Sequence, residues 1–571
     1  MSKFNIFKKG RMTIGPKCMF YAFVFINLIP NLFLLFTEPY NISGKALLLF
    51  IPLGFYLILS SLHKRVGGVQ LYLSPILFFF HAFQLVVFTL FKEDVIAVDM
   101  FLNLVTTNPN EAGELLNSIL APTLITCAVY ISFIYFIVQS FRLKTYYAPS
   151  FRKANSIVGL SIIILSLFLF PSAEDVNTGK FTLHENVYPA NVFYNLGFAA
   201  NKLKKISQYP NTSKEFSFQA TKKEVNSADR EIYVMVVGET ARPDNWGLYG
   251  YERETTPNLA KDSSVVHFND VMTQANATHK SVSILLSAVC AENYNEIYNQ
   301  KSIVSAFNEV GFTTIYISNQ AENGSFIEYY SKEADHVDFY RSNYSKKNCL
   351  DEVLVDRLKH YIDSIPNEDL FVVMHTYGSH FNYRERYSDE FAQFLPDDLI
   401  RIDPKNRATM INAYDNSILY TDYILHQIGR VLEESDSQSS YIYISDHGED
   451  ILDDSRGRFL HASPNPTYYQ LRVPLLTWFS TKYQEGQPHV IEAARANSAK
   501  PLSSNVVFHT MLDIAGVETP YLKRELSVVN SDFKVIKRMY LGDHDNPVHY
   551  YNTNLKRQDK EMIEAKGLSK E

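Results

Sequence analysis

Ionisable side chains follow apolar runs that have the length and composition of buried strands. Glu239 comes directly after "IYVMVV", and Asp446 and His447 come directly after "YIYIS". His380 follows "VVMHTYG", and His461 lies in the loop after Asp446 and His447. Because ligands bind beyond the carboxyl ends of the strands in α/β sheets, we expect these side chains to lie together. The sequence therefore predicts a functional site at this edge of a sheet.

Mixed carboxylate and imidazole side chains suit zinc, which binds their oxygen and nitrogen atoms at about 2.0–2.2 Å. A single acidic residue after a strand is more often a helix cap or turn residue than a metal ligand. Adjacent Asp446 and His447 are harder to explain by packing. Gly238 is expected to let the backbone turn just before Glu239. The pattern indicates a site for one or two zinc ions.

Hydroxyl residues precede an apolar helical run in "MTQANATHKSVSILLSAV". Thr278 is expected to begin a helix, with its hydroxyl in the site and the helix dipole favouring a phosphate group. A threonine at the start of a helix is more often a cap than a nucleophile, and Thr273, Ser281 and Ser283 are competing candidates to Thr278. Residue types and spacing leave this choice open.

The elements that must position these residues are short apolar runs that alternate with helical patterns after residue 230. The runs are "EIYVMVV", "TTIYISN", "LFVVMHTYG", "SSYIYISDHG" and "RVPLLTWFS". Helices are expected in "DEVLVDRLKHYIDSI" and "NAYDNSILYTDYILHQIGRVLEE". The pattern predicts an α/β catalytic domain with a mostly parallel sheet over residues 231–571.

The first part of the chain contains apolar stretches close to the roughly 20 residues that cross a bilayer core. We predict five spans, near residues 18–37, 44–62, 73–91, 118–140 and 154–171, so that residues 1–171 form a transmembrane domain. The N-terminus and the loops after the second and fourth spans are basic, which places them in the cytoplasm. Everything after residue 171 then lies outside, in the periplasm of a bacterium with two membranes.

Two polar segments remain, one between the third and fourth predicted spans and one after the fifth span. Both are predicted to lie outside the cytoplasm. The loop from about residue 92 to 117 favours a solvated interfacial helix that begins near Asn108 or Asn110, with Pro109 in its first turn. Residues 172–230 are predicted to form an amphipathic helix, "VYPANVFYNLGFAANKLKKIS", followed by the linker "QYPNTSKEFSFQATKKEVNSADR".

Charge and cysteine content narrow the class further. The formal net charge is −7 and no basic stripe stands out, which argues against a nucleic-acid partner. Only four cysteines are present, and a disulfide bond between Cys290 and Cys349 is left open.

Four motifs together resemble the bacterial phosphoethanolamine transferases, which are membrane-anchored members of the alkaline phosphatase and sulfatase superfamily. They are "GETARPDNWGLYGYERETTPNL", the threonine of "NATHKSVS", "HTYGSHFNYRERY" and "ISDHGED". The resemblance covers nearly the whole chain. It implies metal ligands at Glu239, Thr278, Asp446 and His447, with Thr278 also accepting the phosphoethanolamine group.

The resemblance also implies substrate-binding residues. His380 and His461 match positions that bind phosphate or a second metal, or that transfer protons. Asn103, Thr107 and Glu111 resemble residues that hold the head group of the lipid donor. These three positions change the expectation for the 92–117 loop from a solvated face to a part of the site.

The chain departs from the members that modify lipid A in two ways. It lacks the cysteines for their periplasmic disulfides, and "ISNQAENGSF" has no lysine, with Gln320 near a polar ligand position instead. "TTNPNEAGE", "LYGYERETTP" and "ISNQ" look closer to the branch that modifies phosphorylated heptose in the lipopolysaccharide core. The resemblance thus implies a monomeric, zinc-dependent inner-membrane enzyme that transfers phosphoethanolamine from phosphatidylethanolamine to lipopolysaccharide, on core heptose or lipid A.

Three alternatives remain. A phosphoglycerol or phosphoethanolamine transferase acting on periplasmic glucans or another envelope glycan shares the fold, zinc and threonine chemistry, but "GET" and "LYGY" argue against it. An active sulfatase needs a Cys or Ser in a C/S-x-P-x-R sequence, which is missing. A membrane-anchored binding protein with a decayed hydrolase domain is disfavoured, because every ligand type and the hydroxyl are kept.

Overall fold

The computed structural model describes residues 15–571 except 93, 107–112, 114–119, 143, 177–178, 224–228, 344–348, 399–401 and 552–554. The chain divides into two compact units. The helical unit comprises Met1–Ile96 and Ile119–Leu196, and the sheet unit comprises Ala97–Ser118 and Gly197–Glu571.

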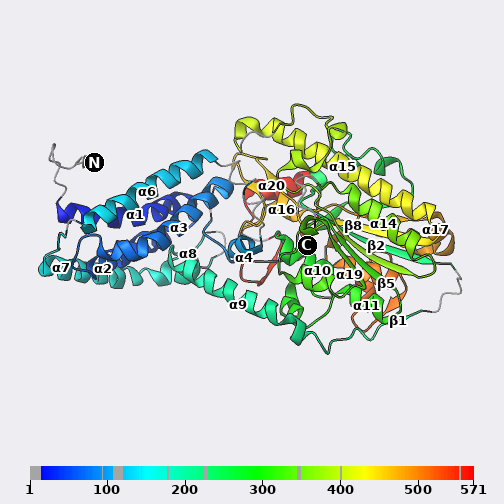
Figure 1. Ribbon diagram of the computed structural model, residues 1–571, viewed down its shortest axis with the longest axis horizontal. Helices are drawn as coiled ribbons and strands as arrows, with labels where there is room; N and C mark the ends of the chain where they lie inside the picture. Colours follow the sequence, from blue (N-terminus) through cyan, green and yellow to red (C-terminus); the bar gives the residue numbers. More distant parts are fainter. Residues whose placement is uncertain are drawn as a thin grey trace, which may run out of the picture. The chain divides into compact units, whose positions relative to one another are not determined.

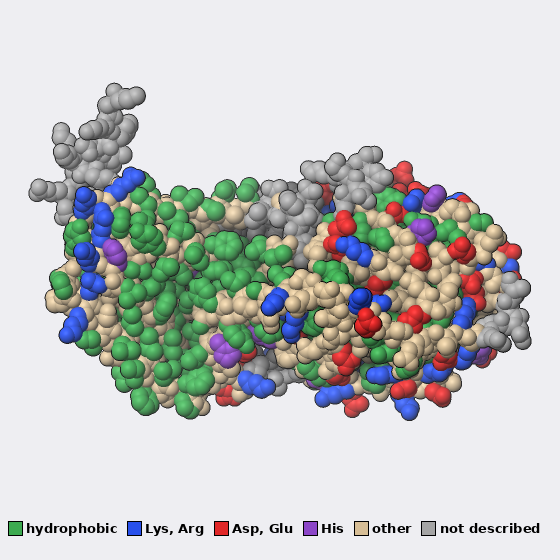
Figure 2. Space-filling view, turned by 60° about the horizontal axis from the view of Figure 1, so that its bottom comes forward, with side chains coloured by type: hydrophobic (Ala, Val, Ile, Leu, Met, Phe, Trp, Pro, Cys, Tyr) green, Lys and Arg blue, Asp and Glu red, His purple; other side chains and the backbone are tan. Residues whose placement is uncertain are grey.

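Long apolar helices build the helical unit (Figure 1). They are α1 (Pro16–Thr37), α2 (Ile42–Ser61), α3 (Gly68–Phe91), α6 (Leu120–Arg142) and α7 (Pro149–Leu167), followed by the short α8 (Leu183–Asn186). In α1, α2, α7 and the Thr123–Arg142 part of α6, the described residues are long and apolar enough to cross a membrane. The apolar part of α3, Pro75–Phe91, is shorter. Apolar side chains cover much of this unit's surface in Figure 2, as expected for helices that face lipid.

Within the helical unit, α2 and α7 pack closely at glycine residues. A Cβ atom on Gly54 of α2 would lie 2.5 Å from the carbonyl oxygen of Gly159 in α7, so these helices approach at small residues, as membrane helices do.

The loops after α2 and α6 lie side by side, since Val66 N–H donates to Thr145 O at 2.9 Å and Tyr147 N–H donates to Lys64 O at 2.8 Å. Lys and Arg side chains gather at one end of this unit (Figure 2).

The sheet unit is built on seven strands in the order β3-β11-β8-β2-β7-β5-β6. Strands β8, β2, β7, β5 and β6 are parallel to one another, whereas β11 runs antiparallel to both β8 and β3. The bounds are β3 (Val265–Phe268), β11 (Leu475–Phe479), β8 (Gln438–Ser445), β2 (Glu231–Gly238), β7 (Leu370–His375), β5 (Thr313–Ser318) and β6 (His336–Phe339). All five predicted strands are present, and the predicted mostly parallel sheet is confirmed.

Four strand pairs lie outside the central sheet. They are β1 (Thr221–Lys222) with β13 (Val517–Glu518), β4 (Asp270–Met272) with β12 (Pro501–Ser503), β9 (Asp450–Ile451) with β10 (Phe459–Leu460), and β14 (Met539–Leu541) with β15 (Pro547–His549).

Helices cover both faces of the central sheet (Figure 1). Apolar residues of α10, α11 and α19 share one core with Tyr233, Met235 and Val237 of β2, and Phe307 of α11 stacks on Phe371 of β7 with ring centroids 3.8 Å apart. Helices α14 and α15 cover the opposite face. The helix bounds are α4 (Val98–Thr106), α9 (Ala190–Thr212), α10 (Thr278–Leu285), α11 (Ile303–Glu309), α12 (Phe326–Ser331), α13 (Tyr340–Asn343), α14 (Glu352–Ser364), α15 (Arg407–Glu434), α16 (Tyr468–Leu471), α17 (Thr481–Gly486), α18 (Pro488–Asn497), α19 (Val506–Ile514) and α20 (Arg557–Ala565).

The predicted linker is wrong over residues 208–222. Helix α9 continues to Thr212, Phe218 is fully buried in the core of the sheet unit, and Thr221–Lys222 pairs with β13. Aromatic residues among the polar ones bury this segment against the sheet unit. The overall polarity of the segment obscured their contribution. Cys290 and Cys349 both lie in the described part of the chain and form no disulfide bond with each other.

Candidate active site

The predicted site residues follow the carboxyl ends of adjacent parallel strands. Glu239 follows β2, Asp446 and His447 follow β8, Gln320 lies two residues after β5, and His380 lies beyond the end of β7. Since β5, β7, β2 and β8 are consecutive neighbours, the sheet brings these side chains to one edge.

Gly238 serves close packing rather than the turn that the sequence suggested. It is the last residue of β2, and a Cβ atom there would lie 2.5 Å from the hydroxyl oxygen of Tyr443. The change of direction falls at Thr240, whose φ of 63° is unusual for a β-branched residue. Thr240 donates to a Glu239 carboxylate oxygen at 2.7 Å, and its N–H donates to Asp446 Oδ1 at 3.1 Å. The strained residue thus joins two predicted metal ligands.

Thr278 is the first residue of α10, and its hydroxyl points to the strand-end residues. Its Oγ1 lies 3.1 Å from His447 Nε2 and 3.4 Å from Glu239 Oε2. The N-cap of α10 is Ala277, so Thr278 does not act as a side-chain cap. This removes the cap interpretation that the sequence left open.

The competing hydroxyl groups are engaged with backbone carbonyls. Thr273 and Ser281 donate to the carbonyl oxygen of Asp446 at 2.6 and 2.5 Å, and Ser283 donates to that of Lys280 at 2.7 Å. Thr273 and Ser281 therefore fix the backbone beside His447, while Thr278 presents its oxygen to the site.

Three side chains are close enough to share a metal ion. One ligand atom from each of Glu239, His447 and His461 lies within 4.8 Å of the others. Asp446 Oδ2 lies 3.1 Å from His447 Nε2 and, although buried, accepts no hydrogen bond. A buried carboxylate oxygen without a donor is costly unless a cation compensates it. Carboxylate and imidazole donors fit zinc, so this group of residues is suited to hold it.

His461 is oriented by Glu449, a residue for which the sequence analysis predicted no role. Its Nδ1 lies 3.2 Å from Glu449 Oε1, and its ring lies 4.0 Å from the His447 ring, between centroids. Burial lowers the pKa of both His447 and His461 to about 4, and it also lowers the pKa of His380. All three imidazoles are therefore neutral near pH 7, as metal binding and proton acceptance require.

The predicted substrate-binding residues are only partly described. Gln320 Nε2 donates to Thr376 O at 2.9 Å and lies 3.4 Å from Glu239 Oε2, so its amide contacts a predicted metal ligand. Asn103 lies on α4. Thr107 and Glu111 lie outside the described residues, as does the predicted helix start near Asn108 or Asn110.

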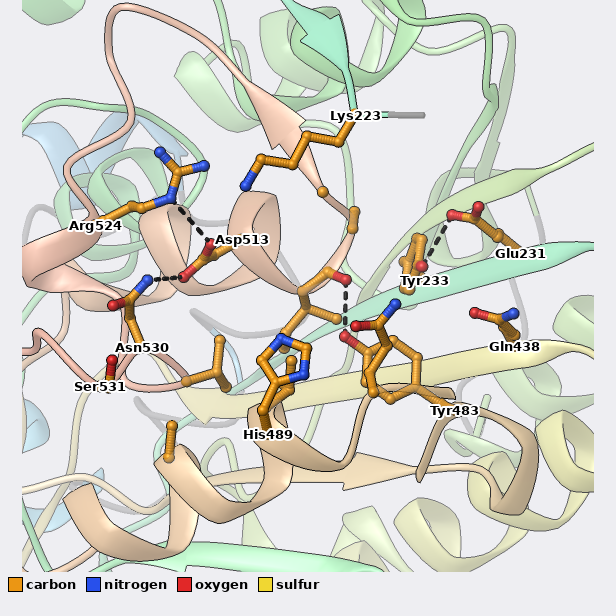
Figure 3. Close-up of a pocket in the computed structure, with 17 residues that line it drawn as sticks. Lys223, Glu231, Tyr233, Gln438, Tyr483, His489, Asp513, Arg524, Asn530 and Ser531 are labelled. Carbon is orange, nitrogen blue, oxygen red and sulfur yellow. Dashed lines mark hydrogen bonds and ion pairs between the residues drawn. The ribbon is translucent and has the colours of Figure 1, made fainter. Parts of the chain in front are cut away.

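A cavity of about 290 Å³ lies away from these residues (Figure 3). Glu231 and Gln438, which line it, are the first residues of β2 and β8, so the cavity is at the opposite ends of these strands. Its Lys223 is 3.0 Å from Glu518, and its Arg524 is 3.7 Å from Asp513, so both cations have acidic partners. The cavity is not part of the candidate active site.

The model of the sulfatase family matches residues 231–517, about half of the chain. The protein belongs to the sulfatase family. The matched region contains Glu239, Thr278, Asp446, His447 and His461.

Curated relatives carry a narrower name. Phosphoethanolamine transferase EptA of Escherichia coli K12 is 31% identical over 310 residues, which cover 52% of this chain and 55% of that protein. The chain thus spans about half the length of this relative. Phosphoethanolamine transferase EptC of the same strain is 24% identical over 455 residues, which cover 76% of this chain and 77% of that protein.

Solved structures support the fold of both units. The integral membrane lipooligosaccharide phosphoethanolamine transferase A of Neisseria meningitidis aligns with a TM-score of 0.70 at 20% identity, covering 89% of this chain and 98% of that one. The C-terminal periplasmic domain of Escherichia coli EptC, in a complex with Zn, aligns with a TM-score of 0.54 at 24% identity, covering 60% of this chain and 97% of that one. The predicted fold class, apolar helices followed by a sulfatase-like domain, is confirmed.

Proposed function

We propose that this protein transfers phosphoethanolamine from phosphatidylethanolamine to lipopolysaccharide, with Thr278 carrying the group between donor and acceptor. The observation that carries the proposal is the Thr278 hydroxyl, 3.1 Å from His447 Nε2 and 3.4 Å from Glu239 Oε2 at the start of α10. The names of the relatives, phosphoethanolamine transferase and lipooligosaccharide phosphoethanolamine transferase, supply the transferred group and the acceptor class.

Two displacements at phosphorus complete the transfer. First, the Thr278 oxygen bonds to the phosphorus of the donor, the bond from phosphorus to the glycerol oxygen breaks, and diacylglycerol leaves with a proton that replaces the one Thr278 released. Second, an acceptor oxygen bonds to the same phosphorus, the bond to Thr278 breaks, and Thr278 regains a proton. Each step therefore leaves the enzyme ready for the next.

Neutral imidazoles are the proposed proton carriers. Glu449 fixes His461 through Nδ1 at 3.2 Å, which leaves Nε2 to take up and return a proton. His380, whose ring centroid is 6.2 Å from that of His461, is the second candidate. Burial lowers the pKa of both, so both are in the neutral form near pH 7, which is the form that can take up a proton.

Glu239, Asp446, His447 and Thr278 are the proposed holders of zinc, the ion named in the EptC complex. Zinc held by these residues would supply positive charge that favours the deprotonated Thr278 oxygen and offsets the charge of the phosphate. The described donors fit one ion. A second ion would take His461 and His380 as ligands in place of their role as proton carriers.

Removal of the metal is expected to lower transfer by about 100-fold or more, because several kcal/mol of charge stabilisation is lost. The measurement is diacylglycerol release from phosphatidylethanolamine vesicles before dialysis against a chelator, after it, and after zinc is restored. Elemental analysis of wild type and Glu239→Gln should show a metal deficit in the variant. Full activity in protein whose metal content is zero would contradict this part of the proposal.

The membrane location follows from the same proposal. With the basic loops in the cytoplasm, the sheet unit lies in the periplasm and the helices anchor the enzyme in the inner membrane. Donor and acceptor are both lipids, so anchoring raises their effective concentration at Thr278.

Mass analysis of lipopolysaccharide tests the acceptor. Cells with the wild-type protein should gain one phosphoethanolamine on the lipopolysaccharide, and cells with Thr278→Ala at the same protein level should not. Fragmentation then assigns the group to the core or to lipid A. An unchanged lipopolysaccharide spectrum with active protein would reject this acceptor and favour an envelope glycan.

A further inference from the structure

A group of charged side chains is buried beside α10, outside the proposed metal site. Its members come from α4, α9, α10 and the turn between β14 and β15, and they are Asp99, Lys202, His279, Lys280, Asp543 and Asp545. We call them the buried charge cluster. All six belong to the sheet unit.

Short ion pairs connect the cluster. Lys280 Nζ lies 2.7 Å from Asp99 Oδ2 and 3.0 Å from Asp545 Oδ1, and Lys202 Nζ lies 2.7 Å from Asp545 Oδ2. The Lys280 side chain is 1% exposed and that of Asp99 is 9% exposed. Buried ion pairs of this kind add little net stability compared with apolar residues of similar size, but breaking one partner is costly. Their effect is therefore to fix which segments lie together.

The segment that the cluster fixes is α4. Asp543 accepts hydrogen bonds from the backbone N–H of Val98 at 2.8 Å and of Asp99 at 3.3 Å, a favourable position for a carboxylate at a helix N-terminus. The Asp99 side chain in turn reaches α10, with Oδ1 3.3 Å from His279 Nε2. Helix α4 is thus held in two ways. The Asp543 carboxylate binds its backbone, and its own Asp99 carboxylate contacts α10.

Helix geometry links this attachment to the reaction. Asp99 and Asn103 are four residues apart on α4, so they lie on the same face of the helix. His279 and Lys280 directly follow Thr278 at the start of α10. One ion pair, between Asp99 and Lys280, therefore joins the α4 face that carries Asn103 to the helix turn that carries the nucleophile.

We propose that Asp99 is a positioning residue that holds α4 against the first turn of α10, so that the head group of the lipid donor meets Thr278. This inference rests on the proposed function and on the contact between Asn103 and the donor head group that the family resemblance implies. It gives a role to His279 and Lys280, neither of which is a proposed metal ligand or proton carrier.

The test uses the full-length protein in vesicles with increasing mole fractions of phosphatidylethanolamine. Mass spectrometry follows the phosphoethanolamine adduct on Thr278 over time. Asp99→Asn is expected to raise the half-saturating donor fraction about tenfold, with a smaller change in the rate at saturation, because misplaced binding groups weaken capture of the donor. Asp99→Glu, which keeps the charge, should recover part of the loss.

Two further variants separate positioning from folding. Asp99→Asn with Lys280→Met removes both charges of the pair, so it avoids an uncompensated lysine yet still lacks the link to α4; it should show the same weak donor binding. Asp559→Asn breaks a different ion pair, in which Asp559 Oδ2 lies 2.6 Å from Arg456 Nη1. This variant should lower stability without changing the half-saturating donor fraction.

The outcomes are distinguishable. An unchanged half-saturating fraction in Asp99→Asn and in the double variant with Lys280→Met, with a normal wild-type adduct, overturns the positioning role alone. The same increase in Asp559→Asn also overturns it, because general destabilisation would then explain the effect. A wild-type protein that forms no adduct overturns the proposed function and this inference with it.

Discussion

Thr278→Ala is expected to lower phosphoethanolamine transfer by at least about 10⁴-fold, since loss of a covalent nucleophile removes the pathway itself. The free energy of unfolding should change by less than about 1 kcal/mol, because Thr278 is only partly buried and does not cap α10. Initial rates of diacylglycerol release and a thermal melt of the same samples give the two values.

Ser283→Ala is the matched control for Thr278→Ala. It also removes a hydroxyl from α10, but its Oγ donates to the Lys280 carbonyl at 2.7 Å and not to the strand-end residues. Its rate should stay within about threefold of wild type, since the hydrogen bonds it loses, worth about 1 kcal/mol each, do not involve the strand-end residues. A Thr278→Ala protein as active as Ser283→Ala would show that the nucleophile is elsewhere.

Arg538→Met is expected to have the largest effect on stability, about 3–5 kcal/mol, because it leaves a buried carboxylate without its cation. Arg538 is fully buried, and its Nη1 lies 2.6 Å from Asp270 Oδ1 in β4. The same guanidinium donates to the Tyr550 hydroxyl at 2.8 Å and to Ser569 O at 2.7 Å. Arg538 thereby ties the end of the chain to the sheet unit, and denaturant unfolding of this unit measures the loss.

The charge explanation of Arg538 is tested by a second substitution. Asp270→Asn combined with Arg538→Met removes both charges and should recover part of the free energy of unfolding lost in Arg538→Met. The free energy of unfolding lost in the double variant could instead equal the sum of the losses in Arg538→Met and Asp270→Asn. The pair would then not be coupled, and the packing of Arg538 would explain its effect.

The strands and the site edge were predictable because they depend on local patterns. Continuous apolar runs mark β2 and β8, and the parallel arrangement then brings Glu239 and Asp446 to one edge. The choice of Thr278 among its neighbours was not fixed by spacing. It depends on where Thr273 and Ser281 find acceptors, and these lie on the Asp446 backbone, far along the chain.

Long-range polar contacts were the part that the sequence did not reveal. Asp99 pairs with Lys280, and Glu449 with His461, but no residue spacing marks such partners. The linker prediction failed for a related reason, because Phe218 is buried by residues from other segments. Gly238 was recognised as necessary, but its reason, contact with Tyr443, belongs to the neighbouring strand.

Intact-protein mass spectrometry after incubation with phosphatidylethanolamine is the direct test of Thr278 as the nucleophile. Wild type is expected to gain the mass of one phosphoethanolamine group, peptide fragmentation should place it on Thr278, and adding lipopolysaccharide should remove it. Thr278→Ala should gain no mass under the same conditions. An unmodified wild type with normal transfer activity, or an equal gain of mass on Thr278→Ala, would rule out Thr278 as the carrier of the group.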